Sequence, residues 1–279
     1  MSNAIAMVND SVRHPLLHFV SQGARWVNQD HYPSHLEGAD EHERWLEFIK
    51  RKGELTRFLP RLRDRANQRD EALAEIGVGY FLEKQCGLPI VGWEPSGANG
   101  KTGEYLTACS EGGKMFIEVK ARGWEQEVVW TEGPNSQRLS RPKFIHAEAR
   151  ATAPWRSVRQ AVKKAYPKLP SNMPTLLVIC DDLFVALTSM PINIEIALYC
   201  PRGAGSYSSD GDYLGEDGCF VDSRYEYLGA VAALNIDFPL GHSQARFRFR
   251  LYDNPKCLPA VAVPQKSFAG YHRFSGASQ

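Results

Sequence analysis

The sequence has almost no net charge, no long hydrophobic run and no secretory leader pattern. Its 33 Lys and Arg residues face 32 Asp and Glu residues, which leaves a formal net charge of +1 over 279 residues, so the chain as a whole is not a polycation. No stretch approaches the roughly 20 apolar residues of a membrane span, so we expect no membrane partner. The start, from Met1 to Met7, lacks a basic region and an apolar run, which predicts a cytoplasmic protein.

Closely spaced metal-binding and nucleotide-binding motifs are also missing. The cysteines have no CxxC spacing, which argues against a structural zinc site, and they are too sparse for a disulfide scaffold. We therefore expect reduced thiols. No GxxxxGK[ST] motif is present, which excludes a P-loop nucleotide site. The six cysteines are Cys86, Cys109, Cys180, Cys200, Cys219 and Cys257.

Hydrophobic patterning predicts a mixed α/β protein with three regions. Residues 1–66 are expected to form an N-terminal helical extension, in which Pro60 kinks or separates two helical segments. Residues 67–182 form the core, beginning with a helix that ends at Gly87. Residues 183–279 form a β-rich extension that completes the core or packs on it. Within this extension, the alternation of Ile192, Ile194, Ile196 and Leu198 with other residues predicts a strand.

A hairpin of the core carries the residues with the clearest chemical use. Residues 114–122 alternate, so Glu118 and Lys120 share one face. A three-residue turn would pair Ser110 with Lys114 and place Glu104 opposite Lys120. Glu104, Glu118 and Lys120 would then converge. A register slip of one residue would move Glu104 to the other face.

Two carboxylates and a lysine at one place suit metal-assisted phosphate chemistry. Carboxylate oxygens bind Mg²⁺, with Mn²⁺ as an alternative, and a bound ion acidifies water and offsets charge on phosphate. A neighbouring lysine orients the water. The structural alternative is a cross-strand Glu–Lys pair that contributes about 0.2–1 kcal/mol to stability.

These motifs together resemble the PD-(D/E)xK nuclease superfamily, which has the restriction-endonuclease-like fold. A helix containing Glu75 precedes Gly103-Glu104, which stands where the family has Pro-Asp, and Glu118-Val119-Lys120 matches the (D/E)xK element. The resemblance covers residues 67–182. It implies a mixed β-sheet flanked by helices, in the order α-β-β-β-α-β.

The resemblance also assigns roles to these residues. Glu104, Glu118 and the backbone carbonyl of Val119 would bind the metal, and Lys120 would position the attacking water. Glu75 would support a second metal or the water network. By family frequency, DNA is the expected substrate rather than RNA.

A basic segment predicts where nucleic acid binds. Nine basic residues and one acidic residue, Glu148, lie between 133 and 170, and such a local field favours a polyanion. The alternative is a solvated helix face that balances acidic segments elsewhere. Trp124, Trp130 and Trp155 are core residues or stack on unpaired bases. The residues predicted to contact nucleic acid are Arg141, Lys143, Arg156, Arg159, Gln160, Lys163 and Lys164.

Two other functions remain open. The Gly103-Glu104 departure is compatible with a catalytically inactive nuclease-like fold that binds nucleic acid or a protein partner. The N-terminal helices and the chain after Tyr227 could also serve as interfaces of a homo-oligomer or of an assembly with a partner subunit.

Overall fold

A mixed β-sheet organises the part of the chain that the computed structural model describes, which comprises residues 13–22, 38–64, 66–121, 154–181, 191–202, 216–238 and 244–276. Within these ranges the sheet has seven strands, whose spatial order follows the sequence. They are β1 (Ile90–Trp93), β2 (Tyr105–Ala108), β3 (Lys114–Ala121), β4 (Thr175–Asp181), β5 (Ala230–Asp237), β6 (Arg246–Asp253) and β7 (His272–Phe274).

The type of strand pairing changes from antiparallel to parallel at β3, within the predicted core. β1, β2 and β3 pair in antiparallel fashion, whereas β3, β4 and β5 are parallel to one another. Parallel neighbours need a crossover connection, and helix α6 (Pro154–Ala165) lies between β3 and β4 in the sequence. The elements from α5 to β4 thus follow the order α-β-β-β-α-β.

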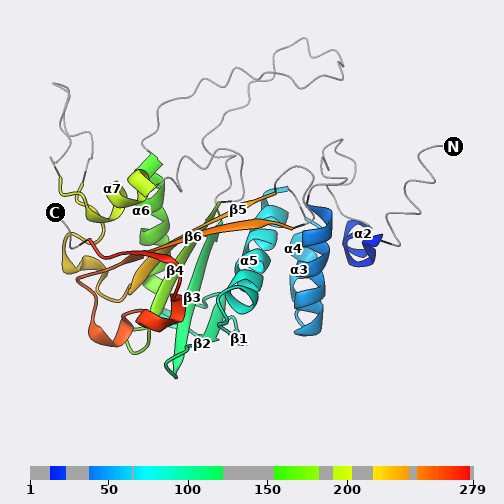
Figure 1. Ribbon diagram of the computed structural model, residues 1–279, viewed down its shortest axis with the longest axis horizontal. Helices are drawn as coiled ribbons and strands as arrows, with labels where there is room; N and C mark the ends of the chain where they lie inside the picture. Colours follow the sequence, from blue (N-terminus) through cyan, green and yellow to red (C-terminus); the bar gives the residue numbers. More distant parts are fainter. Residues whose placement is uncertain are drawn as a thin grey trace, which may run out of the picture.

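Helices cover both faces of the sheet (Figure 1). On one face lie α3 (Ala39–Arg51), α4 (Leu55–Leu62) and α5 (Ala66–Lys84), with α2 (Pro15–Ser21) packed outside α3. On the other face lie α6 and α7 (Pro191–Tyr199). Each face has its own hydrophobic core. The described part of the protein is therefore a three-layer α/β structure. The predicted mixed sheet with flanking helices is confirmed.

Helix α5 is buried on several sides because it lies between the sheet and the outer helices. At Gly77, an added Cβ would stand 2.9 Å from the ring of Trp45 on α3 and 3.0 Å from Ile236 on β5. Glycine at this position therefore allows close packing on both sides of the helix. The predicted helix end is confirmed, since Gly87 has a φ of 66° and the amide of Leu88 donates to the carbonyl of Leu82.

Two local predictions in the outer regions are wrong. Pro60 lies within α4, and the break between α3 and α4 falls at Gly53, which has a φ of 80°. Residues 192–198 form helix α7 rather than a strand. Ile194, Ala197 and Leu198 are buried while Ile192 is 55% exposed, so the apolar contacts follow the helical period.

The residues after 183 complete the sheet. β5 pairs with β4 along six residues and β6 pairs with β5 along eight, so the C-terminal strands continue the same sheet as the hairpin. Among the described helices, none combines the length and the apolar character needed to cross a bilayer.

Candidate active site

The hairpin that carries the predicted site has a wider loop than the sequence suggested. Ala108 pairs with Lys114, so residues 109–113 form the loop and the predicted pairing of Ser110 with Lys114 is wrong. Gly112 and Gly113 have φ angles of 89° and 79°. Two successive left-handed residues widen the turn, which shifts the register by two positions.

This register brings Glu104 beside Glu118 instead of opposite Lys120. Tyr105 pairs with Ile117, and the amide of Glu104 donates to the carbonyl of Ile117 at 3.1 Å. A shift of two residues preserves the face of each side chain. Tyr105 and Ile117 therefore pack towards α5, while Glu104 and Glu118 lie on the face that α6 covers.

Glu118 is the most deeply buried charged group of the site. Its side chain has 0% exposure, and its Oε1 atom accepts hydrogen bonds from Lys120 and from Lys168, the latter at 2.6 Å. Among the described residues, no hydrogen-bond donor contacts its Oε2 atom. A buried carboxylate oxygen without a donor is costly, so this atom is suited to bind a cation or to share a proton.

Glu104 supplies the second carboxyl group. Its Oε2 atom accepts a hydrogen bond from the amide of Val119 at 3.2 Å. Burial raises the pKa of Glu104, and the hydrogen bond and negative charge of Glu118 raise it further, to about 8. Burial and mutual repulsion therefore disfavour the state in which both carboxyl groups are ionised. A divalent cation bound to both groups would reduce this repulsion.

Lys168 is the residue of the site that the sequence did not identify. It ends the 3₁₀ turn η3 (Tyr166–Lys168) after α6, and its Nζ atom lies 2.6 Å from Glu118 and 3.8 Å from Glu104. Burial lowers the pKa of Lys168, but the two glutamates outweigh it and raise the pKa above its usual value. The sequence placed Lys168 only in the basic segment, because no local pattern links it to the hairpin.

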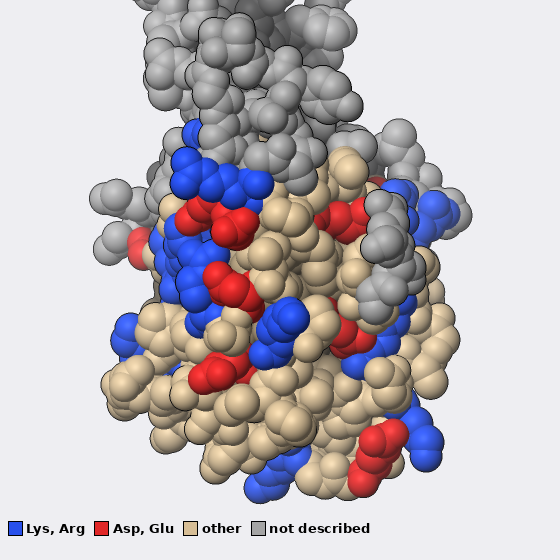
Figure 2. Space-filling model, turned by 90° about the vertical axis from the view of Figure 1, so that its left-hand side faces the viewer, with Lys and Arg blue, Asp and Glu red and all other residues tan. Residues whose placement is uncertain are grey.

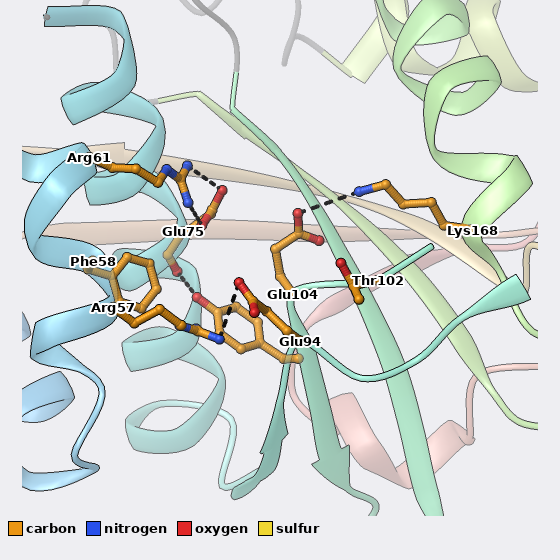
Figure 3. A pocket seen from close by; sticks show the side chains of 10 residues that line it. Arg57, Phe58, Arg61, Glu75, Glu94, Thr102, Glu104 and Lys168 are labelled. Atoms are coloured by element: carbon orange, nitrogen blue, oxygen red, sulfur yellow. Dashed lines mark hydrogen bonds and ion pairs between the residues drawn. The ribbon is translucent and has the colours of Figure 1, made fainter. Parts of the chain in front are cut away.

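Glu75 faces the same cavity but is already paired. Arg61 on α4 donates two hydrogen bonds to its carboxylate, at 2.6 and 2.7 Å. Glu75, Glu104 and Lys168 line one cavity of about 110 Å³. Figure 3 shows Arg61 and Glu75 on the wall of this cavity that the helices form. Glu75 therefore stands near the carboxylate pair with both of its oxygens bound by arginine.

The predicted nucleic-acid contacts divide into three groups. Arg141 and Lys143 lie outside the described residues. Arg156, Gln160, Lys163 and Lys164 are exposed on α6. Arg159 is only 1% exposed and donates to the carbonyls of Ile196 and Ala197.

The prediction that Arg159 binds nucleic acid is therefore wrong, because its guanidinium joins α6 to α7. Trp155 is likewise buried in the core beneath α6, whereas Trp124 and Trp130 lie outside the described residues. On the face drawn in Figure 2, acidic side chains are interspersed with the basic ones, and Lys163 itself pairs with Glu216 at 2.8 Å. The positive charge of α6 is thus partly balanced locally.

No protein-family model, curated protein or solved structure matches the chain. Across the described ranges, no cluster of three or more His, Cys, Asp or Glu side chains could hold a metal ion. The candidate site consists instead of two carboxyl groups, two lysines and the backbone beside Val119, and its chemistry has to be inferred from this geometry.

Proposed function

We propose that the protein is a divalent-cation-dependent nuclease of the PD-(D/E)xK type, which hydrolyses phosphodiester bonds in DNA. The observation that carries this proposal is the buried pair of Glu104 and Glu118, in which one oxygen has no donor and one carboxyl group has a raised pKa. The succession of elements from α5 to β4, which follows the order the resemblance implies, supports it.

The residues present fit a magnesium or manganese ion. Glu104 and Glu118 would hold it together with the backbone carbonyl of Val119, a set of oxygen donors that suits Mg²⁺. When bound, the ion would supply positive charge to a phosphate and make a water more acidic. Two protein carboxylates are a usual complement for Mg²⁺, which retains several waters.

Lys120 is the residue assigned to position the attacking water. Its ammonium group bonds to Glu118 and its side chain is 24% exposed, so it reaches from the buried carboxylate towards solvent. The ammonium has three donors and can therefore bond to Glu118 and to a water at the same time. Arg61 fixes Glu75 at the other wall of the cavity, where Glu75 supports the surrounding water network.

The exposed residues of α6 provide contacts for the phosphate backbone. Arg156, Gln160, Lys163 and Lys164 follow the helical spacing of one exposed face. Such contacts supply affinity without choosing a base sequence. Arg141 and Lys143 are proposed to add to this surface. The preference for DNA over RNA rests on the resemblance alone.

A second candidate function has one observation in its favour. Lys120 and Lys168 already bring two ammonium groups to the two carboxyl groups, so the charge of the site can be balanced without a metal. This arrangement suits a catalytically inactive nuclease-like fold that binds nucleic acid.

Cleavage assays distinguish the two candidates. Linear, circular and single-stranded DNA are incubated with Mg²⁺, Mn²⁺ or EDTA, using the wild-type protein and the variants Glu118→Gln and Lys120→Ala. We expect metal-dependent cleavage that falls at least about 100-fold in each variant, because each removes a group that acts on the reacting phosphate.

The control is Lys114→Ala, which removes an exposed lysine from the far end of the same strand and should leave cleavage unchanged. Circular dichroism checks that each variant is folded. Cleavage that persists in both site variants would exclude the mechanism. Salt-sensitive DNA binding without cleavage by the wild-type protein would favour the inactive module.

A further inference from the structure

Two lysines from different parts of the chain bind the same oxygen of Glu118. Lys120 lies two positions along the same strand and reaches Glu118 by local geometry. Lys168 comes from η3, on the far side of α6 in the sequence, and reaches Oε1 at 2.6 Å. The second contact exists only because the fold brings η3 to the hairpin, so it calls for a separate explanation.

The loop before Glu104 positions the backbone of Lys168. The side-chain amide of Asn99 donates to the carbonyl of Pro167 at 3.1 Å. At Gly97, an added Cβ would stand 2.1 Å from the carbonyl oxygen of Lys168, so glycine is required for this close approach. The loop that leads to one carboxyl group of the site therefore also fixes the turn that carries this lysine.

The side chain of Lys168 contacts both carboxyl groups and also lines the cavity. Its Nζ atom is 2.6 Å from Glu118 and 3.8 Å from Glu104, its side chain is 22% exposed, and it lines the cavity with Glu104 and Thr102. Figure 3 shows it reaching Glu104 from the side opposite Glu75. The flexible four-carbon stem of a lysine allows the ammonium to move while the backbone stays in place.

The ammonium of Lys168 contacts both carboxyl groups, at 2.6 Å from Glu118 and 3.8 Å from Glu104, whereas the ammonium of Lys120 is paired with Glu118. A cation that bridges the two carboxyl groups would therefore compete with Lys168 for this position, because like charges repel at such distances. Arg57 and Arg61, which also line the cavity, remain paired with Glu94 and Glu75. The displaced ammonium of Lys168 then has a new anion to bind, and a phosphate at the cavity supplies it.

We propose that Lys168 is a second substrate-contacting lysine, which binds Glu118 in the absence of a cation and moves into the cavity to bind a substrate phosphate when a cation is present. This inference rests on the proposed function for the identity of the phosphate. It assigns Lys168 a different role from Lys120, which stays beside Glu118 on the same strand.

The test measures two binding constants in one variant. Mn²⁺ binding is measured by calorimetry without DNA, and binding of a phosphorothioate DNA oligonucleotide is measured by fluorescence anisotropy with Mn²⁺. For Lys168→Met we expect Mn²⁺ to bind about tenfold more tightly, because a competing charge is gone, and the oligonucleotide to bind about tenfold more weakly, because a phosphate contact is gone. Lys168→Arg should restore both values towards those of the wild type.

Lys114→Met is the control and should change neither constant. A purely structural role for Lys168 would weaken both, and unchanged or jointly weakened binding in folded Lys168→Met overturns the inference. If Lys168→Met does not fold, Lys168→Gln retains a hydrogen-bond donor for Glu118 and gives the same pair of measurements.

The outcome also separates this inference from the proposed function. Opposite shifts of the two constants in a protein that cuts no DNA would support the role of Lys168 and reject the nuclease. Cleavage by the wild type together with unchanged binding by Lys168→Met would reject the role of Lys168 alone. A wild-type protein that binds no Mn²⁺ would overturn both.

Discussion

Glu104 shows how one side chain can couple the stability of this protein to pH. Its folded pKa of about 8 lies above the ordinary value of 4.5, because burial and the neighbouring Glu118 disfavour its charge. A raised carboxyl pKa contributes stability that is complete below about pH 4.5, and this contribution is lost as the pH rises through 8. Deprotonation of Glu104 therefore destabilises the folded protein at alkaline pH when no cation is present.

We predict that Glu104→Gln removes this pH dependence. Glutamine imitates the protonated carboxyl group, so the variant should match the wild type near pH 5 and melt a few degrees higher near pH 9 in EDTA. Thermal unfolding between pH 5 and pH 9 measures the difference. Adding Mn²⁺ should reduce the difference in melting temperature between the variant and the wild type near pH 9, because the cation stabilises only the ionised pair of carboxylates.

Glu111→Gln is the matched control, because Glu111 is exposed in the β2–β3 loop. It should leave the pH profile of the wild type unchanged. A stability difference between Glu104→Gln and the wild type that stays constant from pH 5 to pH 9 would contradict the assigned cause.

At the scale of secondary-structure elements, the contact between η1 (Ala98–Gly100) and η3 determines where Lys168 stands. Asn99 has a left-handed φ of 57° and donates to the carbonyl of Pro167. Asn99→Gly keeps this backbone conformation accessible and removes only the hydrogen bond. We predict a loss of about 0.5–1.5 kcal/mol in the free energy of unfolding. If the protein cleaves DNA as proposed, the rate of cleavage should also fall several-fold, because the position of Lys168 becomes less fixed.

Urea unfolding measures the change in the free energy of unfolding, and the cleavage assay measures the change in the rate of cleavage. Lys101→Ala, an exposed change on the same loop, should affect neither by a comparable amount. Cleavage by Asn99→Gly at the wild-type rate would show that the loop does not position the lysine.

The geometry of the secondary-structure elements also explains which parts of the site could be predicted from the sequence. The alternation of β3 assigns Glu118 and Lys120 to one face, because a strand has a strict period of two. The register of the hairpin could not be predicted, because it depends on the left-handed backbone conformation of Gly112 and Gly113, which sets the length of the loop. Lys168 could not be predicted either, because its position depends on a hydrogen bond between residues 68 positions apart.

The predictions for residues 192–198 and for Arg159 were wrong for related reasons. The isoleucines of 192–198 fit a strand period as well as a helical one, and only packing against α6 decides between them. Arginine is usually exposed, but Arg159 follows Val158 and precedes Val162 on the buried side of α6. Charge identifies a basic segment, whereas the helical period decides which of its residues reach solvent.

At the scale of the whole molecule, the sheet does not end where the resemblance to the nuclease family ends. β5 lies between β4 and β6, and its residues from Ala230 to Leu234 are all buried. The outer helix α3 also depends on this region, since the ring of Trp45 packs against Phe238 at a centroid distance of 5.9 Å. The predicted core of residues 67–182 thus shares both of its hydrophobic faces with the C-terminal strands.

We therefore predict that a chain ending at Asp181 does not fold cooperatively. Its β4 would become an open edge with unpaired backbone groups, and the apolar surfaces beneath α3 and α6 would lose their partners in β5. Urea unfolding should lack a sharp transition, and a hydrophobic dye should bind at low urea. A chain ending at Gly276 is the control and should unfold like the full protein. A cooperative transition in the shorter chain would instead make residues up to 181 an independent domain, and the C-terminal strands an addition to it.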